Sequence, residues 1–205
     1  MIQLQHSFTS IVSGPTGSGK TQFTIKLVNH ASKMISPPPD EIVWCYGIYQ
    51  EIFQSLTGVR FVDGLPNISE FDDSKHTLMI IDDLMHEADD RVAQLFTKGS
   101  HHKNISIVFL TQNIFHSSIY NRTMNLNSHY IVLFKNPRDV GPVGYIGRQM
   151  FAKRGAQFLS DSFEDATSRS YGYLFLDLKS NTDQQLRVRT NIFPDESPQY
   201  VYLPK

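Results

Sequence analysis

Residues 8–21 read FTSIVSGPTGSGKT, and this stretch decides the fold class. Residues 8–13 contain Phe, Ile and Val among small hydroxyl residues and are read as a buried strand, and residues with helical character follow from position 21. Between them stands the pattern G-x-x-x-x-G-K-[ST], whose glycines let successive backbone N–H groups point at phosphate oxygens. The N-terminus of the following helix adds partial positive charge. The stretch therefore predicts a phosphate-binding cradle between a strand and a helix.

The cradle assigns roles to single side chains. Lys20 is expected to reach the β and γ phosphates of a nucleotide, and the Thr21 hydroxyl is expected to ligate Mg²⁺. ATP and Mg²⁺ are therefore the expected ligands. A chance glycine-rich turn is the alternative, and the agreement of motif, strand and helix argues against it. The expected nucleotide-binding residues are Gly14, Pro15, Thr16, Gly17, Ser18, Gly19, Lys20 and Thr21.

A second polar group follows the apolar run at residues 78–81, where Asp82 and Asp83 stand. Ligands of open α/β sheets bind at the carboxyl ends of the strands, so these acids are expected beside the cradle. Asp82 would hold the Mg²⁺ shell, and Asp83 would polarise the attacking water. The alternative is that both acids cap the following turn.

A third polar group follows the apolar run at residues 105–110. It consists of Thr111, Gln112 and Asn113, and it is expected at the same edge of the sheet. Gln112 or Asn113 would sense the γ phosphate or orient the water. Capping of the next helix by Thr111 or Asn113 is the alternative.

Short apolar runs that alternate with helical stretches predict one α/β domain over residues 1–205, with a mostly parallel sheet. Residues 171–178 and 186–192 are expected to form a hairpin at the sheet edge. The tail from residue 194 is expected to run over the surface, as a disordered end or as a docking arm. The other expected strands are residues 8–13, 41–46, 78–81, 105–110 and 130–134, and the expected helices are residues 21–32, 48–56, 89–96 and 143–153.

Composition narrows the class of protein. Hydrophobic residues make up 40% and charged residues 19%, which is typical of a folded globular chain. The formal net charge is −1, so contact with nucleic acid would need a local basic patch or several subunits. The single cysteine, Cys45, cannot form an internal disulfide, and neither a signal peptide nor a membrane span is evident. An intracellular location is expected, with nucleus and cytoplasm both open.

The succession GPTGSGKT, LMIIDD and LFTKGSHHKNISIVFLTQN resembles the FtsK and HerA superfamily of DNA translocases. It is most similar to the poxvirus-type genome-packaging ATPases of large DNA viruses and of Polinton-like or adintovirus-like elements. The resemblance covers roughly residues 7–138. It implies a three-layer, RecA/FtsK-like P-loop NTPase core there, with residues 139–205 completing the sheet and the tail.

The resemblance also implies a function and partners. Family members hydrolyse ATP, translocate double-stranded DNA into a capsid and work as rings, usually hexamers, which implies a capsid or portal-vertex partner. A neighbouring subunit contributes an arginine to each site, for which Arg122 is the first candidate and Arg91 the second; either is alternatively a solvated surface arginine. The family often has glutamate where this chain has Asp83, which is one methylene shorter.

Residues 98–103 form a small basic turn. In a ring, copies of this turn would sum to a patch suited to DNA phosphates, with Lys98, His101, His102 and Lys103 as the contacts. Two rival functions remain open. One is another P-loop enzyme, such as a small-molecule kinase, whose lid would use Arg148, Lys153 and Arg154. The other is a nucleotide-gated assembly protein with weak hydrolysis, because Asp83 is short.

Overall fold

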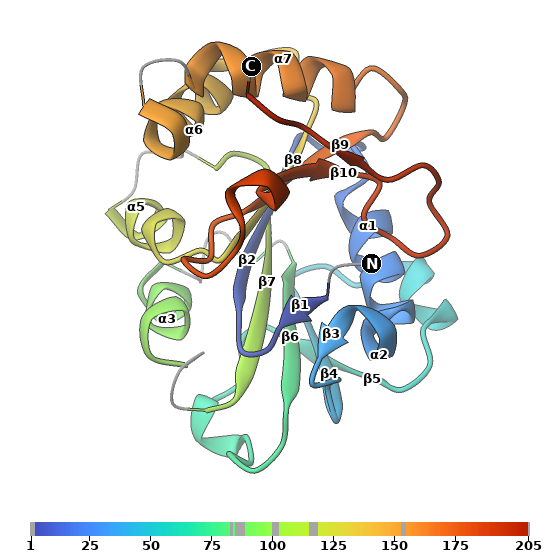
Figure 1. Cartoon of the computed structure of the whole chain (residues 1–205). Helices are drawn as coiled ribbons and strands as arrows, with labels where there is room; N and C mark the ends of the chain where they lie inside the picture. Colours follow the sequence, from blue (N-terminus) through green and yellow to red (C-terminus); the bar gives the residue numbers. More distant parts are fainter. Residues whose placement is uncertain are drawn as a thin grey trace.

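Nine strands of the described residues form one sheet, in the order β11-β10-β9-β8-β2-β7-β6-β4-β5 (Figure 1). The computed structural model describes residues 3–82, 84, 89–99, 103–114, 119–152 and 155–204, apart from the side chains of residues 89, 90, 98, 99 and 119–122. The strands are β2 (Thr9–Ser13), β4 (Glu41–Tyr46), β5 (Val59–Asp63), β6 (Thr77–Asp82), β7 (Ile105–Thr111), β8 (Tyr130–Phe134), β9 (Tyr173–Asp177), β10 (Val188–Thr190) and β11 (Tyr200–Val201).

Strands β5, β4, β6, β7, β2 and β8 pair in parallel, whereas β9, β10 and β11 add antiparallel pairs. The predicted α/β fold with a mostly parallel central sheet is therefore confirmed. A separate short parallel pair joins β1 (Leu4–Gln5) to β3 (Ile35–Ser36). The carboxyl ends of β2, β6 and β7 meet at one edge, because these strands run in the same direction in adjacent positions.

Helices cover both faces of the sheet, which gives three layers. In Figure 1, α1 and α2 lie on one side of the sheet, and α3 and α5 lie on the other. The helices are α1 (Lys20–Asn29), α2 (Ala31–Met34), α3 (Asp89–Gln94), α5 (Ile119–Leu126), α6 (Gly141–Phe151) and α7 (Gly155–Ala166). None of the helices in the described ranges is long and apolar enough to cross a membrane.

Successive side chains along each strand point to opposite faces of the sheet, so the hydrophobic core forms two layers. In β6, Met79 and Ile81 pack toward α3, α6 and α7, while Leu78 and Ile80 pack toward α1 and α2. Cys45 faces the first of these layers and is fully buried, and burial raises the pKa of its thiol to about 12. The thiol therefore stays protonated and inert, as expected for a cysteine in a buried strand.

Several sequence-based predictions of local structure were wrong. Residues 48–56 were predicted as an α-helix, but the chain forms the short 3-10 helix η1 (Glu51–Ser55). The predicted hairpin is confirmed as the antiparallel pair β9 and β10, but its edge position was wrong, because β11 pairs with the outer side of β10. Strand β5 and helix α7 were not predicted at all. In α7 the low helix propensity of Gly155 obscured the helix, although this glycine lets α6 approach closely: a Cβ at Gly155 would overlap the carbonyl of Gly147.

The C-terminal tail is docked on the sheet and helix α1. Glu196 accepts hydrogen bonds from the Tyr173 hydroxyl (2.6 Å) and from Lys26 Nζ (3.0 Å). Asp195 also pairs with Lys26, at 3.1 Å. These contacts hold the tail against its own domain, so the alternative of a disordered end was wrong, and the docking arm stays a prediction.

An Arg189→Met variant is expected to lose about 3 kcal/mol of unfolding free energy, because breaking a buried ion pair leaves an uncompensated charge. The Arg189 and Asp177 side chains are 8% and 5% exposed, and Nη2 lies 3.3 Å from Oδ2. The control is Arg60→Met, since the Arg60–Glu41 pair is 45% and 32% exposed and should contribute under about 1 kcal/mol. Urea denaturation measures both, and equal losses would contradict the assignment of a structural ion pair.

Candidate nucleotide site

The loop from β2 to α1 is fixed to the sheet at its first glycine. The Gly14 N–H donates to the Thr111 carbonyl at 3.1 Å, so the loop starts against the end of β7. A Cβ at Gly14 would lie 2.7 Å from both Phe134 Cβ and Ser18 Oγ, which leaves no room for a side chain. Further along, Gly17 and Gly19 adopt φ values of 77° and 111°, which side chains with a Cβ rarely tolerate. The glycines of the motif are thus required by the path of this loop.

Lys20 begins helix α1 and reaches back over the loop. Its Nζ donates to the carbonyls of Gly14 (2.6 Å) and Pro15 (3.0 Å). These contacts hold the ammonium group inside the curve of the loop, where the motif requires a positive charge for phosphate. A bound triphosphate would offer stronger, charged acceptors to the same group.

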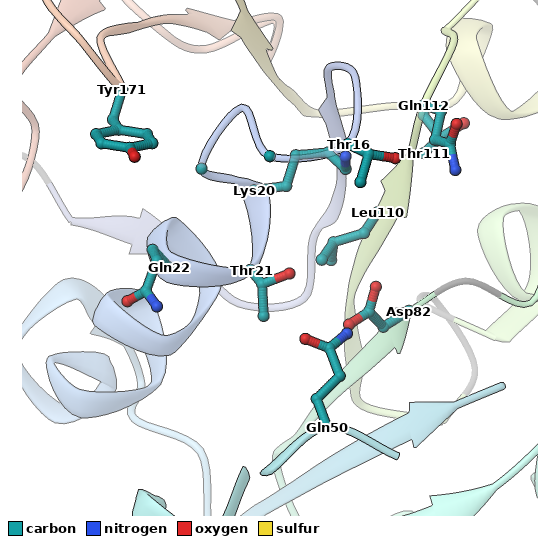
Figure 2. Close-up of a pocket in the computed structure, with 12 residues that line it drawn as sticks. Thr16, Lys20, Thr21, Gln22, Gln50, Asp82, Leu110, Thr111, Gln112 and Tyr171 are labelled. Atoms are coloured by element: carbon teal, nitrogen blue, oxygen red, sulfur yellow. The ribbon is translucent and has the colours of Figure 1, made fainter. Parts of the chain in front are cut away.

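A pocket of about 390 Å³ opens beside the loop, and Figure 2 shows the side chains around it. Its volume lies in the range typical of small-molecule sites. The pocket joins the phosphate cradle to the carboxyl ends of β6 and β7. Its lining consists of Thr16, Gly17, Gly19, Lys20, Thr21, Gln22, Gln50, Asp82, Leu110, Thr111, Gln112 and Tyr171.

Thr21 and Asp82 line this pocket from two different elements. Thr21 is half-buried in the first turn of α1, and Asp82 is 6% exposed at the end of β6. Figure 2 shows both side chains on the same side of Lys20. A hydroxyl and a carboxylate are hard oxygen donors of the kind that Mg²⁺ prefers beside a phosphate. The residues present therefore fit Mg²⁺ bound together with a nucleotide.

The polar residues after β7 take different positions. Gln112 is exposed and lines the pocket, whereas Asn113 lines, with Gln112, a smaller cavity against α6. The Thr111 hydroxyl accepts from the Asn113 N–H at 3.3 Å, so Thr111 stabilises the local turn. Of the two predicted γ-phosphate sensors, Gln112 is the one that lies in the nucleotide pocket.

Some predicted residues fall outside what the structure describes. Asp83, His101 and His102 lie outside the described residues, and so do Lys153 and Arg154 of the rival lid. The predictions for Arg122 and Lys98 concern side chains that the structure does not describe, although the backbones lie in α5 and in the π-helical turn at Leu95–Gly99.

Two other predicted residues are held by contacts away from the pocket. Lys103 forms an ion pair with Asp73, at 2.7 Å. Lys103 precedes β7 and Gln112 follows it, so the two residues lie at opposite ends of this strand. Arg91, in α3, donates to the Leu65 carbonyl at 2.9 Å. Neither residue is among those that line the pocket.

Five lining residues were not among the predicted site residues, and two of them, Leu110 and Thr111, end β7 directly before Gln112. The other three lie elsewhere in the chain. Gln22 follows the motif on α1, Gln50 precedes η1, and Tyr171 precedes β9. Gln22 could have been found as the residue after the motif. For Gln50 and Tyr171 no local pattern gives a signal, because only the fold brings these residues to the pocket.

The fold and the loop define the class: an α/β protein in which a G-x-x-x-x-G-K-[ST] loop joins β2 to α1 at the carboxyl ends of the parallel strands. No known family model matches the sequence, and no curated protein is significantly similar to it. Among solved structures, the fold is similar to that of the genome packaging NTPase B204 from Sulfolobus turreted icosahedral virus 2, in complex with ATP-gammaS. The TM-score is 0.51 at 12% sequence identity, and the match covers 97% of each chain. At this identity the likeness shows a shared fold.

Proposed function

We propose that this protein hydrolyses ATP and uses the energy to translocate double-stranded DNA during packaging of a viral genome. The observation that carries the ATPase part is the pocket itself, in which Lys20, Thr21, Asp82 and Gln112 converge from three elements. The likeness to the fold of a viral genome packaging NTPase, over 97% of both chains, supports the packaging part. The resemblance of the three sequence motifs to DNA translocases supports it independently.

We assign each residue a role in hydrolysis. The backbone N–H groups of the loop and the Lys20 ammonium bind and orient the phosphates, and they stabilise charge that develops on the transferred group. Thr21 and Asp82 would hold Mg²⁺, which neutralises phosphate charge when it is bound. Asp83 is assigned as the base that takes a proton from water, and Gln112 orients that water.

The oligomer belongs to the same proposal. Members of the families that the motifs resemble act as rings, so we assign this chain to a homo-oligomer, most simply a hexamer. Within it, DNA would be held through its phosphates, independently of base sequence. Lys98, His101, His102 and Lys103 are the contacts proposed from sequence. For Lys103 to bind DNA, its ammonium group would have to leave Asp73 or contact a DNA phosphate and Asp73 together.

The experiment is ATP hydrolysis by the purified protein with and without double-stranded DNA, alongside the oligomer mass. We expect ADP and inorganic phosphate in equal amounts and a higher rate with DNA of any sequence. Phosphate transfer to a small acceptor instead of water would favour a kinase. ATP binding without turnover would favour a nucleotide-gated assembly protein. Turnover that DNA leaves unchanged would contradict the translocase part alone.

A further inference from the structure

Tyr171 occupies a position in its turn where a side chain is unusual. The Arg169 carbonyl accepts from the Gly172 N–H at 3.0 Å, which closes a β-turn between α7 and β9. Tyr171 is the third residue of this turn and has a φ of 61°, a conformation that normally calls for glycine or asparagine. A non-glycine residue that keeps such a conformation points to a role for its side chain.

Its neighbour Gly172 brings the backbone of the turn close to helix α7. A Cβ at Gly172 would overlap the Ala166 carbonyl at the end of α7, so the backbone passes close to that helix. The closed turn and this close passage fix the backbone of Tyr171. The fold therefore places this residue beside the pocket before any ligand binds.

The ring is presented to the pocket and is not buried in the core. Tyr171 is 72% exposed, the largest exposed fraction among the exposed large hydrophobic residues of the described chain. It is also the single aromatic residue among the described residues that line the pocket. A Cβ at Gly19 would come within 3.2 Å of the ring, so the tyrosine lies against the cradle just before Lys20.

Tyr171 and Asp82 lie at opposite ends of the pocket. In Figure 2, Tyr171 lies on one side of Lys20, and Asp82 and Gln112 lie on the other. Lys20 and Thr21 fix the β and γ phosphates, so the γ end of a triphosphate points toward Asp82 and Gln112. The nucleoside end must then leave the cradle on the Tyr171 side.

We infer that Tyr171 stacks on the base of the bound nucleotide, an inference that rests on the proposed nucleotide site. Every nucleobase has a π-face, and an exposed aromatic ring beside a phosphate-binding loop can stack on it. Stacking of this kind tolerates different bases. The ring thus adds affinity for a nucleoside triphosphate over a bare triphosphate.

The test is calorimetric titration, in the presence of Mg²⁺, with two probes: ATPγS and inorganic triphosphate. Tyr171→Ala and Tyr171→Gly are expected to bind ATPγS about tenfold more weakly than the wild type. Triphosphate affinity should stay within about twofold, since the cradle is intact. Tyr171→Phe should bind both probes like the wild type. Tyr200→Ala, which removes an exposed tyrosine from β11, is the matched control.

Stability provides an independent control. Tyr171→Gly relieves an unfavourable φ but makes the unfolded chain more flexible, so the melting temperature should stay within about 2 °C of the wild type. A variant that is equally stable yet binds ATPγS more weakly has lost a ligand contact. A loss of binding that comes with a large drop in melting temperature would instead indicate a purely structural role.

The outcomes separate this inference from the proposed function. Unchanged ATPγS affinity in Tyr171→Ala and Tyr171→Gly would overturn the stacking role while leaving the nucleotide site intact. Parallel losses for both probes would also overturn it, because the ring would then support the cradle and not the base. A loss in Tyr171→Phe equal to that in Tyr171→Ala would assign the effect to the hydroxyl. Failure of the wild type to bind either probe would reject the nucleotide site and this inference together.

Discussion

Lys20→Ala is expected to reduce ATP hydrolysis at least about 100-fold, the effect typical of removing one preorganised charge-stabilising donor. The fold should survive, because Lys20 is half-buried at the start of α1 while the two core layers are built by other residues. ATP affinity should fall as well, since the ammonium group contacts the phosphates in the ground state. Steady-state phosphate release and calorimetric titration measure the two effects.

The matched control for this variant is Lys33→Ala. Lys33 lies in α2, is exposed and does not line the pocket, so its removal deletes an equal charge without touching the cradle. Turnover of the Lys33→Ala protein should equal that of the wild type. If a folded Lys20→Ala protein hydrolysed ATP at the wild-type rate, the assignment of the cradle would be wrong.

The second large effect concerns Arg122, the arginine proposed to act on a neighbouring subunit's site. Arg122→Ala is expected to bind ATP nearly normally but to hydrolyse it about 10³ to 10⁵ times more slowly, as in NTPases that depend on an arginine finger. Activity per wild-type subunit should also rise with protein concentration, because the site is complete only between subunits.

A mixing experiment tests the direction of this dependence. Arg122→Ala subunits added to Lys20→Ala subunits should restore some turnover, because an intact cradle then faces an intact arginine at some boundaries. Arg91→Ala is the control: Arg91 already donates to the Leu65 carbonyl within its own subunit. Full activity of Arg122→Ala together with loss in Arg91→Ala would transfer the role to Arg91. Concentration-independent activity of a monomer would reject the ring.

The parts of the fold that sequence predicted are those in which local pattern and burial agree. The predicted strands at residues 41–46 and 130–134 have the same bounds as β4 and β8, because their runs of apolar residues are buried in the sheet. Strand β5 escaped prediction because it has partly exposed residues at the sheet edge. Around η1, tertiary contacts override the helical periodicity of the sequence. The Phe53 ring stacks on the Phe61 ring, with their centroids 5.1 Å apart.

The candidate site likewise contains residues that sequence could predict and residues that it could not. Thr16, Gly17, Gly19, Lys20 and Thr21 of the cradle line one pocket together with Asp82 and Gln112. Sequence alone could group these residues, because they belong to a contiguous motif or follow buried strands. Tyr171 reaches the pocket only because α7 and β9 bring its turn beside Gly19, more than 150 positions earlier in the sequence. Contacts between segments so distant leave no periodic signal in the sequence.

The most direct test of the nucleotide site is a crystal structure of the protein with Mg²⁺ and ATPγS. We predict that the β and γ phosphates lie inside the loop of residues 14–21. Lys20 Nζ should leave the Gly14 and Pro15 carbonyls, to which it donates at 2.6 and 3.0 Å, and contact phosphate oxygens instead. Nucleotide bound elsewhere, with Lys20 still on those two carbonyls, would contradict the account.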